Sequence, residues 1–309
     1  MRHLLTGIGF GLIFLFGWLF LLSSGKSSGG GTLPSADVVV MDTEGLPQRV
    51  RPVDLTGPFN FAGENIPVSN FDVRERLDQE LLRNAYFHRN TVLLLKRRAR
   101  FFPIIEQILA EEGVPDDLKY LAVAESGLSN ATSVAGAKGV WQFMTPTGKS
   151  FGLEINDEVD ERFHLEKATR AACKYLKGYH RKYQDWRWVA AAYNMGGPNV
   201  NKWRDRQRAE TVFDLDINSE TMAYLFRIVA LKTILKDPAA FGYEVDSADN
   251  YPPLDRYSTV TVTKSISNLG DFAKENNTSY RMLKVYNPWL VGGSLTVSRG
   301  NSYAIRIPD

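Results

Sequence analysis

The chain has 309 residues, of which 44% are hydrophobic and 12% aromatic, so it can bury a sizeable core and is not an intrinsically disordered protein. Lysine and arginine number 37 against 35 aspartate and glutamate, and this near balance argues against a nucleic-acid partner. The single cysteine, Cys173, excludes an internal disulfide. It lies in an apolar helical pattern, so we expect it to pack in the core.

The N-terminal residues have the pattern of an export signal. An apolar run from Leu4 to Leu22 follows Arg2 and precedes serine- and glycine-rich sequence. The run is long enough to span a bilayer, so residues 1–24 are predicted to be either a cleaved signal peptide or a signal anchor. No cysteine follows the run, which excludes the usual bacterial lipid anchor. Residues 25–58, rich in glycine, serine and proline, are predicted to be a tether.

Helical periodicity dominates the region that follows. Apolar residues recur every three or four positions, which predicts one long amphipathic helix over residues 73–100. Pro103 is predicted to separate it from a second helix that ends at Gly113. Further helices are predicted over 116–127, 145–152, 162–183, 186–193, 199–206 and 220–236. The region from 59 to 248 is therefore predicted to be one mainly helical domain.

The helix predicted over residues 116–127 carries a carboxylate on an apolar face. Gly127 stands where a left-handed helix terminator is expected. The spacing of Leu118, Leu121 and Glu125 places the glutamate on the buried stripe. Poor solvation there would raise the pKa of Glu125 toward the neutral range in which a general acid works. The alternative is that this carboxylate pairs with an arginine or lysine, or reaches water from a frayed helix end.

Two irregular stretches lie between these helices. Residues 128–145 are rich in small residues and glycine, which predicts a loop or a short irregular sheet where backbone can approach a ligand closely. The acidic run of Asp157, Glu158, Asp160 and Glu161 is predicted to form the solvated start of the next helix. A calcium loop would need acids at alternate positions and a later glutamate, so we do not favour one.

The sequence pattern changes near Asp255. Residues 258–263 and 303–307 alternate between polar and apolar positions, which predicts two strands. Two short helical patterns, 269–276 and 280–286, lie between them. The order strand, helix, helix, strand predicts a small α+β module over residues 255–309.

Metal and nucleophile patterns are missing from the sequence. The four histidines lack the spacing of metal ligands, and the sequence contains no His-Glu-x-x-His or phosphate-cradling motif. Its one Gly-x-Ser-x-Gly match, from Gly25 to Gly29, falls in the serine- and glycine-rich stretch predicted to be a tether. We therefore expect neither a metal nor a cofactor.

Four short polar motifs remain, and each has an ordinary structural explanation when taken alone. Gln142 could be a loop hydrogen bonder and Asn194 a helix C-cap, while Tyr193 and Tyr224 could be core aromatics. In chain order, the motifs are Glu125-Ser126, Gly139-Val140-Trp141-Gln142, Ala192-Tyr193-Asn194-Met195-Gly196, and Glu220-Thr221 followed by Tyr224. One carboxylate, one side-chain amide, two tyrosines and one asparagine could converge on a sugar ring.

This series resembles that of lytic transglycosylases of the soluble lytic transglycosylase superfamily, whose fold is related to goose-type lysozyme. Members carry Glu-Ser, Gly-Leu-Met-Gln, Ala-Tyr-Asn-x-Gly and Glu-Thr-x-x-Tyr in this order. Residues 59–127, with Phe61-Ala62-Gly63-Glu64 and the run from Gly113 to Leu121, are similar to the membrane-bound lytic murein transglycosylase D group. Residues 255–309 resemble a LysM module. The resemblance implies a mainly α, lysozyme-like catalytic domain followed by a small α+β LysM-like domain.

Two departures from the family pattern affect these expectations. Val140 and Trp141 stand where leucine and methionine are usual, which alters the floor of the cleft but keeps Gln142. In the C-terminal module, Lys264-Ser265-Ile266-Ser267 replaces the usual Gly-Asp-Thr turn, so the module could bind glycan or only pack and space the chain.

The resemblance implies non-hydrolytic cleavage of the β-1,4 bond between N-acetylmuramic acid and N-acetylglucosamine, giving 1,6-anhydro ends. Glu125 would be the catalytic acid and then the base, and substrate would be bound by Ser126, Gln142, Tyr193, Asn194 and Tyr224. Common hydrolytic routes need a second carboxylate about 5 to 10 Å from the first, and the later motifs offer only Glu220. The alternatives are a hydrolysing muramidase on the same fold and a non-catalytic peptidoglycan-binding protein.

The same resemblance gives expectations for partners and location. The chain would act as a monomer on peptidoglycan glycan strands, in the periplasm of the bacterial cell envelope. Its N-terminal segment would hold it to a membrane if that segment is not cleaved.

Overall fold

The computed structural model describes residues 51–309. The export segment predicted over residues 1–24 and most of the tether predicted over 25–58 lie outside the described residues. From Arg51 onward the chain runs as one compact unit. Leu55 already packs in the helical core, and the backbone of Arg51 exchanges hydrogen bonds of 2.7 and 2.6 Å with the Tyr86 hydroxyl.

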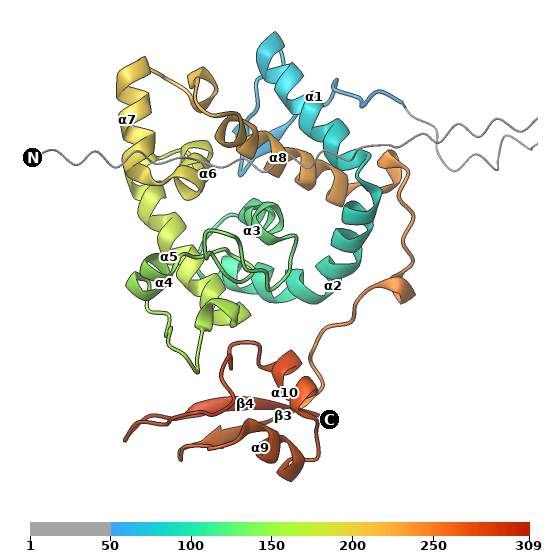
Figure 1. Ribbon diagram of the computed structural model, residues 1–309. Coiled ribbons are helices and arrows are strands. Elements are labelled where there is room, and N and C mark those ends of the chain that lie inside the picture. Colours follow the sequence, from blue (N-terminus) through green and yellow to red (C-terminus); the bar gives the residue numbers. More distant parts are fainter. Residues whose placement is uncertain (1–50) are drawn as a thin grey trace, which may run out of the picture. The chain divides into compact units, whose positions relative to one another are not determined.

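The predicted fold class, mainly α with a small α+β module, is confirmed. The helices are α1 (Phe71–Ala85), α2 (His88–Glu111), α3 (Lys119–Ser126), α4 (Thr145–Ser150), α5 (Leu165–Tyr183), α6 (Trp186–Met195), α7 (Gly197–Gln207), α8 (Ser219–Lys236), α9 (Leu269–Glu275) and α10 (Tyr280–Tyr286). The short α3 packs against α2 and α8 and lies among the longer helices (Figure 1). Along the described chain, none of the helices is both long and apolar enough to cross a membrane.

A tight hairpin fixes the approach to α3. Strands β1 (Asn60–Phe61) and β2 (Glu64–Asn65) pair antiparallel. The two residues between them, Ala62 and Gly63, both have positive φ, as the favoured two-residue hairpin turn requires. The backbone N–H of Ala62 donates to Asp117, whose carboxylate also pairs with Lys232 of α8 at 2.6 Å. The hairpin, the residues before α3 and α8 are therefore held together at one carboxylate.

The helices between residues 71 and 113 differ from the sequence prediction. We predicted one helix over 73–100 and a second after Pro103, but the break lies at Tyr86–Phe87 and Pro103 is inside α2. A hydrogen bond between nearby residues spans the break: the hydroxyl of Thr91 donates to the carbonyl of Asn84 at 2.6 Å, which satisfies a group at the end of α1. Pro103 points to solvent, so its ring does not disturb the core.

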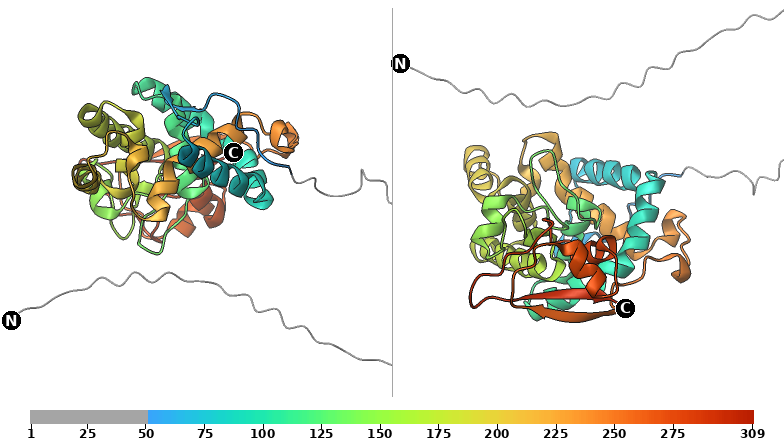
Figure 2. Two further views of the ribbon diagram at one scale, coloured as in Figure 1. Left: turned by 90° about the horizontal axis from the view of Figure 1, so that it is seen from above. Right: turned by 60° about the horizontal axis from the view of Figure 1, so that its bottom comes forward.

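The C-terminal module has the predicted element order. Strands β3 (Tyr257–Val262) and β4 (Tyr303–Pro308) pair antiparallel, with Val260 opposite Ile305, and α9 and α10 lie between them in sequence. Leu269, Leu283 and Ile305 are fully buried in a core of their own. In Figure 1 and the right-hand view of Figure 2, the strands and both helices form a small body beside the larger helical region.

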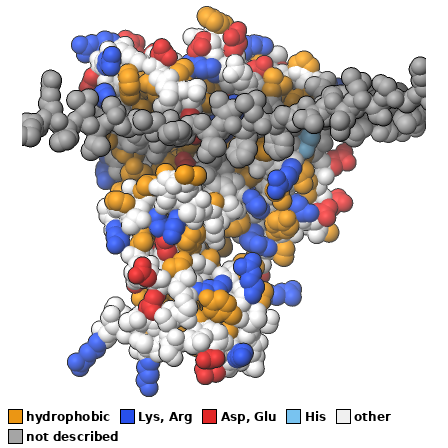
Figure 3. Space-filling model, viewed as in Figure 1, with side chains coloured by type: hydrophobic (Ala, Val, Ile, Leu, Met, Phe, Trp, Pro, Cys, Tyr) orange, Lys and Arg blue, Asp and Glu red, His pale blue; other side chains and the backbone are white. Residues whose placement is uncertain are grey.

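The prediction of a solvated acidic helix start at residues 157–161 was wrong for most of the run. Asp157 is exposed, as predicted, but Asp160 and Glu161 are 2% and 4% exposed, and Glu158 bonds to the C-terminal module. Asp160 and Glu161 pair with the nearby Arg162 and Lys167, whereas the partners of Glu158 lie far away in the sequence, where a local pattern does not reveal them. Elsewhere, Cys173 is fully buried, as predicted. On the face in Figure 3, basic and acidic side chains are interspersed, in keeping with the balanced composition.

Candidate active site

Helix α3 presents Glu125 in its last turn. A 3₁₀ turn, Asp116–Leu118, leads into the helix, and Gly127 ends it with φ of 59° and an N–H bond to the carbonyl of Val123. Leu118 and Leu121 are completely buried, with no accessible surface. Glu125 follows on the same stripe and is partly buried. A helix this short is stabilised mainly by packing of its apolar face, which therefore also fixes the carboxylate.

The carboxyl group of Glu125 meets α8. The hydroxyl of Tyr224, a residue 3% exposed, donates to Glu125 Oε1 at 2.5 Å. Burial raises the pKa of Glu125 to about 7, and the charge of Glu220 adds to this rise. The hydrogen bond from Tyr224 and the positive charge of Arg227 lower that pKa but do not offset burial. At neutral pH the group can therefore both give and take a proton.

Tyr193 lies close enough to the same carboxyl group for the charge of Glu125 to act on it. Its hydroxyl donates to the backbone carbonyl of Trp141 at 2.6 Å. Burial raises the pKa of Tyr193 and Tyr224 well above the usual value, and the negative charge of Glu125 raises it further. Both phenols consequently stay protonated and act as hydrogen-bond donors near Glu125.

Residues 136–143, which we call the site loop, pass between these elements. Ser126 donates to the carbonyl of Val140 at 2.8 Å. Gln142 has φ of 50°, and its side-chain amide donates to the carbonyls of Ala131 and Gly139 at 3.1 and 2.8 Å. The donors of Ser126 and Gln142 are thus used within the protein, where they hold the loop in place.

The six predicted site residues do not all make contact with one another. Tyr224 bonds Glu125 directly, whereas Ser126, Gln142 and Tyr193 meet at the site loop. Asn194 is half-buried beside Tyr193, and in the described part of the chain its side chain makes no hydrogen bond. The amide oxygen of Gln142 also has no partner among the described residues.

Two charged residues that matter for the site were missed in the sequence. Arg227 lies one turn after Tyr224 on α8, and its positive charge acts on Glu125. The buried carboxylate of Glu80 on α1 pairs with Arg227 at 3.4 Å and with Arg83 at 2.8 Å. The i, i+3 spacing of Tyr224 and Arg227 could have suggested the first, but only tertiary structure reveals Glu80. In residues 51–309, His, Cys, Asp and Glu side chains form no cluster of three or more that could hold a metal.

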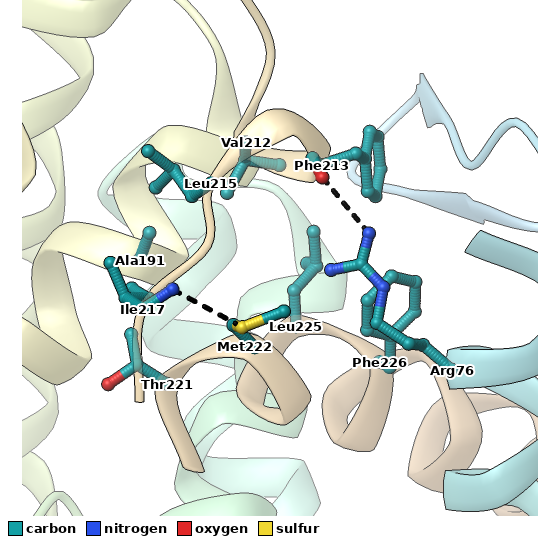
Figure 4. A pocket seen from close by; sticks show the side chains of 10 residues that line it. All are labelled: Arg76, Ala191, Val212, Phe213, Leu215, Ile217, Thr221, Met222, Leu225 and Phe226. Atoms are coloured by element: carbon teal, nitrogen blue, oxygen red, sulfur yellow. Dashed lines mark hydrogen bonds between the residues drawn. The ribbon is translucent and has the colours of Figure 1, made fainter. Parts of the chain in front are cut away.

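A small pocket lies beside the first turns of α8, where Met222 and Leu225 are among the residues that line it (Figure 4). Arg76 donates to the carbonyl of Phe213 at 3.0 Å, and the N–H of Ile217 lies 3.4 Å from the sulfur of Met222. The lining residues are Arg76, Ala191, Val212, Phe213, Leu215, Ile217, Thr221, Met222, Leu225 and Phe226. None of the predicted site residues lines this pocket, so it is a separate feature that ties the approach of α8 to α1.

Comparison with known families agrees with this geometry. The sequence model of the transglycosylase SLT domain matches residues 102–214, which include Glu125, Gln142 and Tyr193. The model of the soluble lytic transglycosylase C-terminal LysM-like domain matches residues 258–309. The chain thus contains an SLT domain and a LysM-like domain. Helix α8 lies between the two matched regions, and its Tyr224 bonds to Glu125 inside the first of them.

The chain is also similar to known proteins along its sequence. Over 247 residues it is 27% identical to the membrane-bound lytic murein transglycosylase D of Escherichia coli K12, a match that covers 77% of this chain and 53% of the relative. The chain therefore spans about half the length of that relative.

Two solved structures are also similar over part of the chain. An inactive variant of the lytic transglycosylase Slt from Pseudomonas aeruginosa has a TM-score of 0.37 and 20% identity, over 49% of this chain and 26% of that chain. The 70 kDa soluble lytic transglycosylase of Escherichia coli has a TM-score of 0.39 and 16% identity, over 60% of this chain and 37% of that chain.

Proposed function

We propose that this protein is a peptidoglycan lytic transglycosylase, a lyase that cleaves the β-1,4 bond between N-acetylmuramic acid and N-acetylglucosamine. The observation that carries the proposal is a single carboxyl group, Glu125, whose pKa of about 7 suits it to act as acid and then as base. The SLT domain match and the relationship to a lytic murein transglycosylase support the same reaction class.

The proposed reaction balances without water. Protonated Glu125 gives its proton to the glycosidic oxygen, and the bond from that oxygen to C1 of the muramoyl sugar breaks. The resulting carboxylate takes the proton of the C6 hydroxyl of the same sugar, whose oxygen bonds to C1. The products are a free hydroxyl on the leaving sugar and a 1,6-anhydro-muramoyl end. Glu125 is protonated again, so the catalyst is restored.

The neighbouring side chains suit three tasks. Tyr224 orients the carboxyl group of Glu125 through its 2.5 Å hydrogen bond. Ser126 and Tyr193 hold the backbone of the site loop, so that substrate meets a fixed surface. The amide of Asn194 and the amide oxygen of Gln142, which have no protein partner in the described residues, are free to bind sugar hydroxyl and acetamido groups.

We further propose how the chain is divided and where it works. Residues 59–248 would form the catalytic domain and 255–309 the LysM-like module, with an export segment over 1–24 and a tether over 25–58. The protein would act as a monomer on glycan strands in the periplasm, for remodelling and turnover of the cell wall. The name of the membrane-bound relative supports work at the cell envelope.

Mass spectrometry of released muropeptides tests the reaction. Residues 32–309 are expected to release products with anhydro ends, which are one water lighter than hydrolysed ends. Glu125→Gln should lower release by about 100-fold or more, because it removes proton transfer. Glu220→Gln is the matched control: Glu220 is exposed on the first turn of α8, and this variant should keep the anhydro product.

Other outcomes would identify the alternatives. Hydrolysed ends, lost in both variants, would indicate a muramidase that uses Glu125 and Glu220 together. Binding to peptidoglycan without release of any product, unchanged in Glu125→Gln, would indicate a non-catalytic binding protein.

A further inference from the structure

The segment between α4 and α5 is built into the C-terminal module. We call residues 154–166 the docked segment. Val159 is 1% exposed and belongs to the apolar core of the module, and its backbone bridges to Leu290. The carbonyl of Glu158 accepts hydrogen bonds from the N–H groups of Val291 and Gly292, at 2.9 and 3.1 Å. The module therefore grips the main chain of this segment and does not merely touch its surface.

Side chains strengthen the same grip. The carboxylate of Glu158 accepts a hydrogen bond from the N–H of Thr296 at 2.7 Å and another from the hydroxyl of Ser294. One residue beyond Val159, the N–H of Asp160 donates to the carbonyl of Trp289 at 2.8 Å. Residues 158–160 are thus fixed by the module at three successive positions.

Asp160 passes this constraint to Arg162. Arg162 Nε donates to Asp160 Oδ1 at 2.8 Å and Nη2 donates to Oδ2 at 2.7 Å, while both side chains are only 3% exposed. This bidentate geometry fixes the plane of the guanidinium group. A buried ion pair is weak evidence for stability, because removing both charges from water offsets much of their attraction. The pair of Asp160 and Arg162 is well suited to fixing the orientation of the guanidinium group.

The other edge of the guanidinium group holds the site loop. Arg162 Nη1 donates to the carbonyls of Gly136 and Phe143, each at 3.1 Å, which are the two ends of the loop. Lys138 adds a 3.3 Å contact to Asp160. At Gly139 the loop packs on the backbone of Arg162 so closely that a Cβ atom would lie 1.8 Å from the Arg162 carbonyl oxygen.

The site loop in turn holds the groups around Glu125. It carries Gln142, and its carbonyls at Val140 and Trp141 accept the hydroxyls of Ser126 and Tyr193. The loop belongs to no named helix or strand. Within it the backbone groups of Lys138 and Phe143 bond to each other at 3.1 and 3.2 Å, and the contacts made by Arg162 add to that pairing.

We propose that Arg162 is a positioning residue and that, through it, docking of the C-terminal module sets the geometry of the site loop. The module would then contribute to the reaction by holding the site loop in a fixed position beside Glu125. This inference rests on the proposed function where it concerns activity. The coupling itself, from Glu158 through Asp160 and Arg162 to the loop, is independent of the reaction.

Two variants cut this connection at different points. Glu158→Ala removes the side-chain grip of the module on the docked segment, at a surface position where the fold should tolerate the change. Arg162→Lys keeps the positive charge but loses the planar fork that serves Asp160 and the loop together. Tyr303→Phe is the matched control, because it removes hydrogen bonds of 2.9 and 3.1 Å to Glu154 across the same interface without touching residues 158–162.

The experiment compares these variants in full-length protein in detergent. Hydrogen exchange of peptides covering residues 136–143 should be about tenfold faster in Glu158→Ala and Arg162→Lys, and within about twofold of wild type in Tyr303→Phe. On soluble glycan strands, kcat should fall about tenfold in the first two variants with KM changed less than about threefold, because the bound geometry is affected more than binding. Thermal unfolding confirms that each variant is folded.

Each outcome decides the inference. Wild-type exchange in the site loop of Glu158→Ala would overturn it, even if Arg162→Lys failed to fold. Faster exchange with an unchanged kcat would overturn the positioning role. If wild-type protein released no product from glycan, the proposed function would fail, and the exchange data alone would then confirm or refute the coupling between module and loop.

Discussion

At the scale of a single residue, the pKa of Glu125 is set by groups that act in opposite directions. Burial and the charge of Glu220 raise its pKa, while Tyr224 and Arg227 lower it. A carboxyl group whose pKa lies near 7 is about half protonated at neutral pH, which suits a group that must give a proton and then accept one. Glu80 contributes indirectly, because its pairing with Arg227 engages a guanidinium that would otherwise favour ionised Glu125.

This balance predicts how activity depends on pH. The rate should fall as pH rises through about 7, because the acid form of Glu125 is lost. Tyr224→Phe removes a hydrogen bond that favours the carboxylate, so the midpoint of this fall should move to higher pH by about one pH unit. Tyr193→Phe is the control, since the Tyr193 hydroxyl donates to Trp141 and not to Glu125. A midpoint that stays fixed or moves down in Tyr224→Phe would contradict the assignment.

The raised pKa also predicts a change in stability. A carboxyl that binds its proton more tightly in the folded chain loses that advantage as pH rises from its ordinary value of 4.5 through about 7. The free energy of unfolding of wild type should therefore fall by about 3 kcal/mol relative to Glu125→Gln between pH 4.5 and 8. Denaturant titrations at several pH values measure this difference. For Glu220→Gln, which removes only the smaller contribution of a neighbouring charge, the difference from wild type should change much less with pH. A flat difference for Glu125→Gln would rule out the raised pKa.

At the scale of elements, a short helix is fixed by its neighbours. Helix α3, which carries the carboxylate of Glu125, is too short to be stable alone. Its start is held by Asp117, which binds both Ala62 and Lys232. Helix α8 supplies Tyr224 and Arg227 from one face and Lys232 from two turns further along. The candidate site is thus a contact between α3 and α8, and the site loop bonds to Ser126 of α3 beside it.

The position of Pro103 inside helix α2 leads us to expect a measurable effect on the free energy of unfolding. Pro103 lies inside the helix, where it removes a backbone hydrogen bond to the preceding turn. Pro103→Ala should raise the free energy of unfolding by about 1–3 kcal/mol, since a proline in a helix interior is about 3 kcal/mol less favourable than alanine. Pro146→Ala is the matched control, because Pro146 stands in the first turn of α4, where no such bond is lost. Equal effects at both positions in chemical denaturation would refute this explanation.

At the scale of the whole described chain, the C-terminal module is joined to the helical region by shared core and polar contacts. Val159 of the helical region lies in the core of the module, and Arg306 of β4 pairs with Glu166 of α5. Trp289 stacks on His164 and on Tyr303, which extends the contact. A module attached only by a linker would share none of these groups.

This joining predicts cooperative unfolding. Calorimetry of the protein should show the helical region and the module unfolding in a single transition, because unfolding of the helical region takes Val159 out of the core of the module and breaks the polar contacts between them. Val159→Asp places a charge in the core of the module and should split the transition in two or lower its midpoint by several degrees. Val134→Asp is the control, since Val134 is fully exposed and its substitution should leave the transition intact. Two separate transitions in wild type would show that the module is independent.

Local sequence patterns determined much of this protein. The period of apolar residues predicted helices α5, α6 and α8, and alternation of polar and apolar residues predicted strands β3 and β4. The position of Glu125 on an apolar stripe predicted that its pKa is raised. These features succeed because each depends on residues within a turn or two of one another. The order of the short motifs, through its resemblance to a known family, predicted that Glu125, Gln142 and Tyr193 belong to one site.

Only the tertiary structure decided which polar groups meet. The proline that predicted a break is accommodated on the solvent side of α2, and the break lies instead at Tyr86–Phe87. Glu158 and Asp160 bond to groups in the C-terminal module, up to 138 positions away, and Asp160 also pairs with Lys138 of the site loop. Burial of a charge depends on where its partner is in space, and no local period records that position.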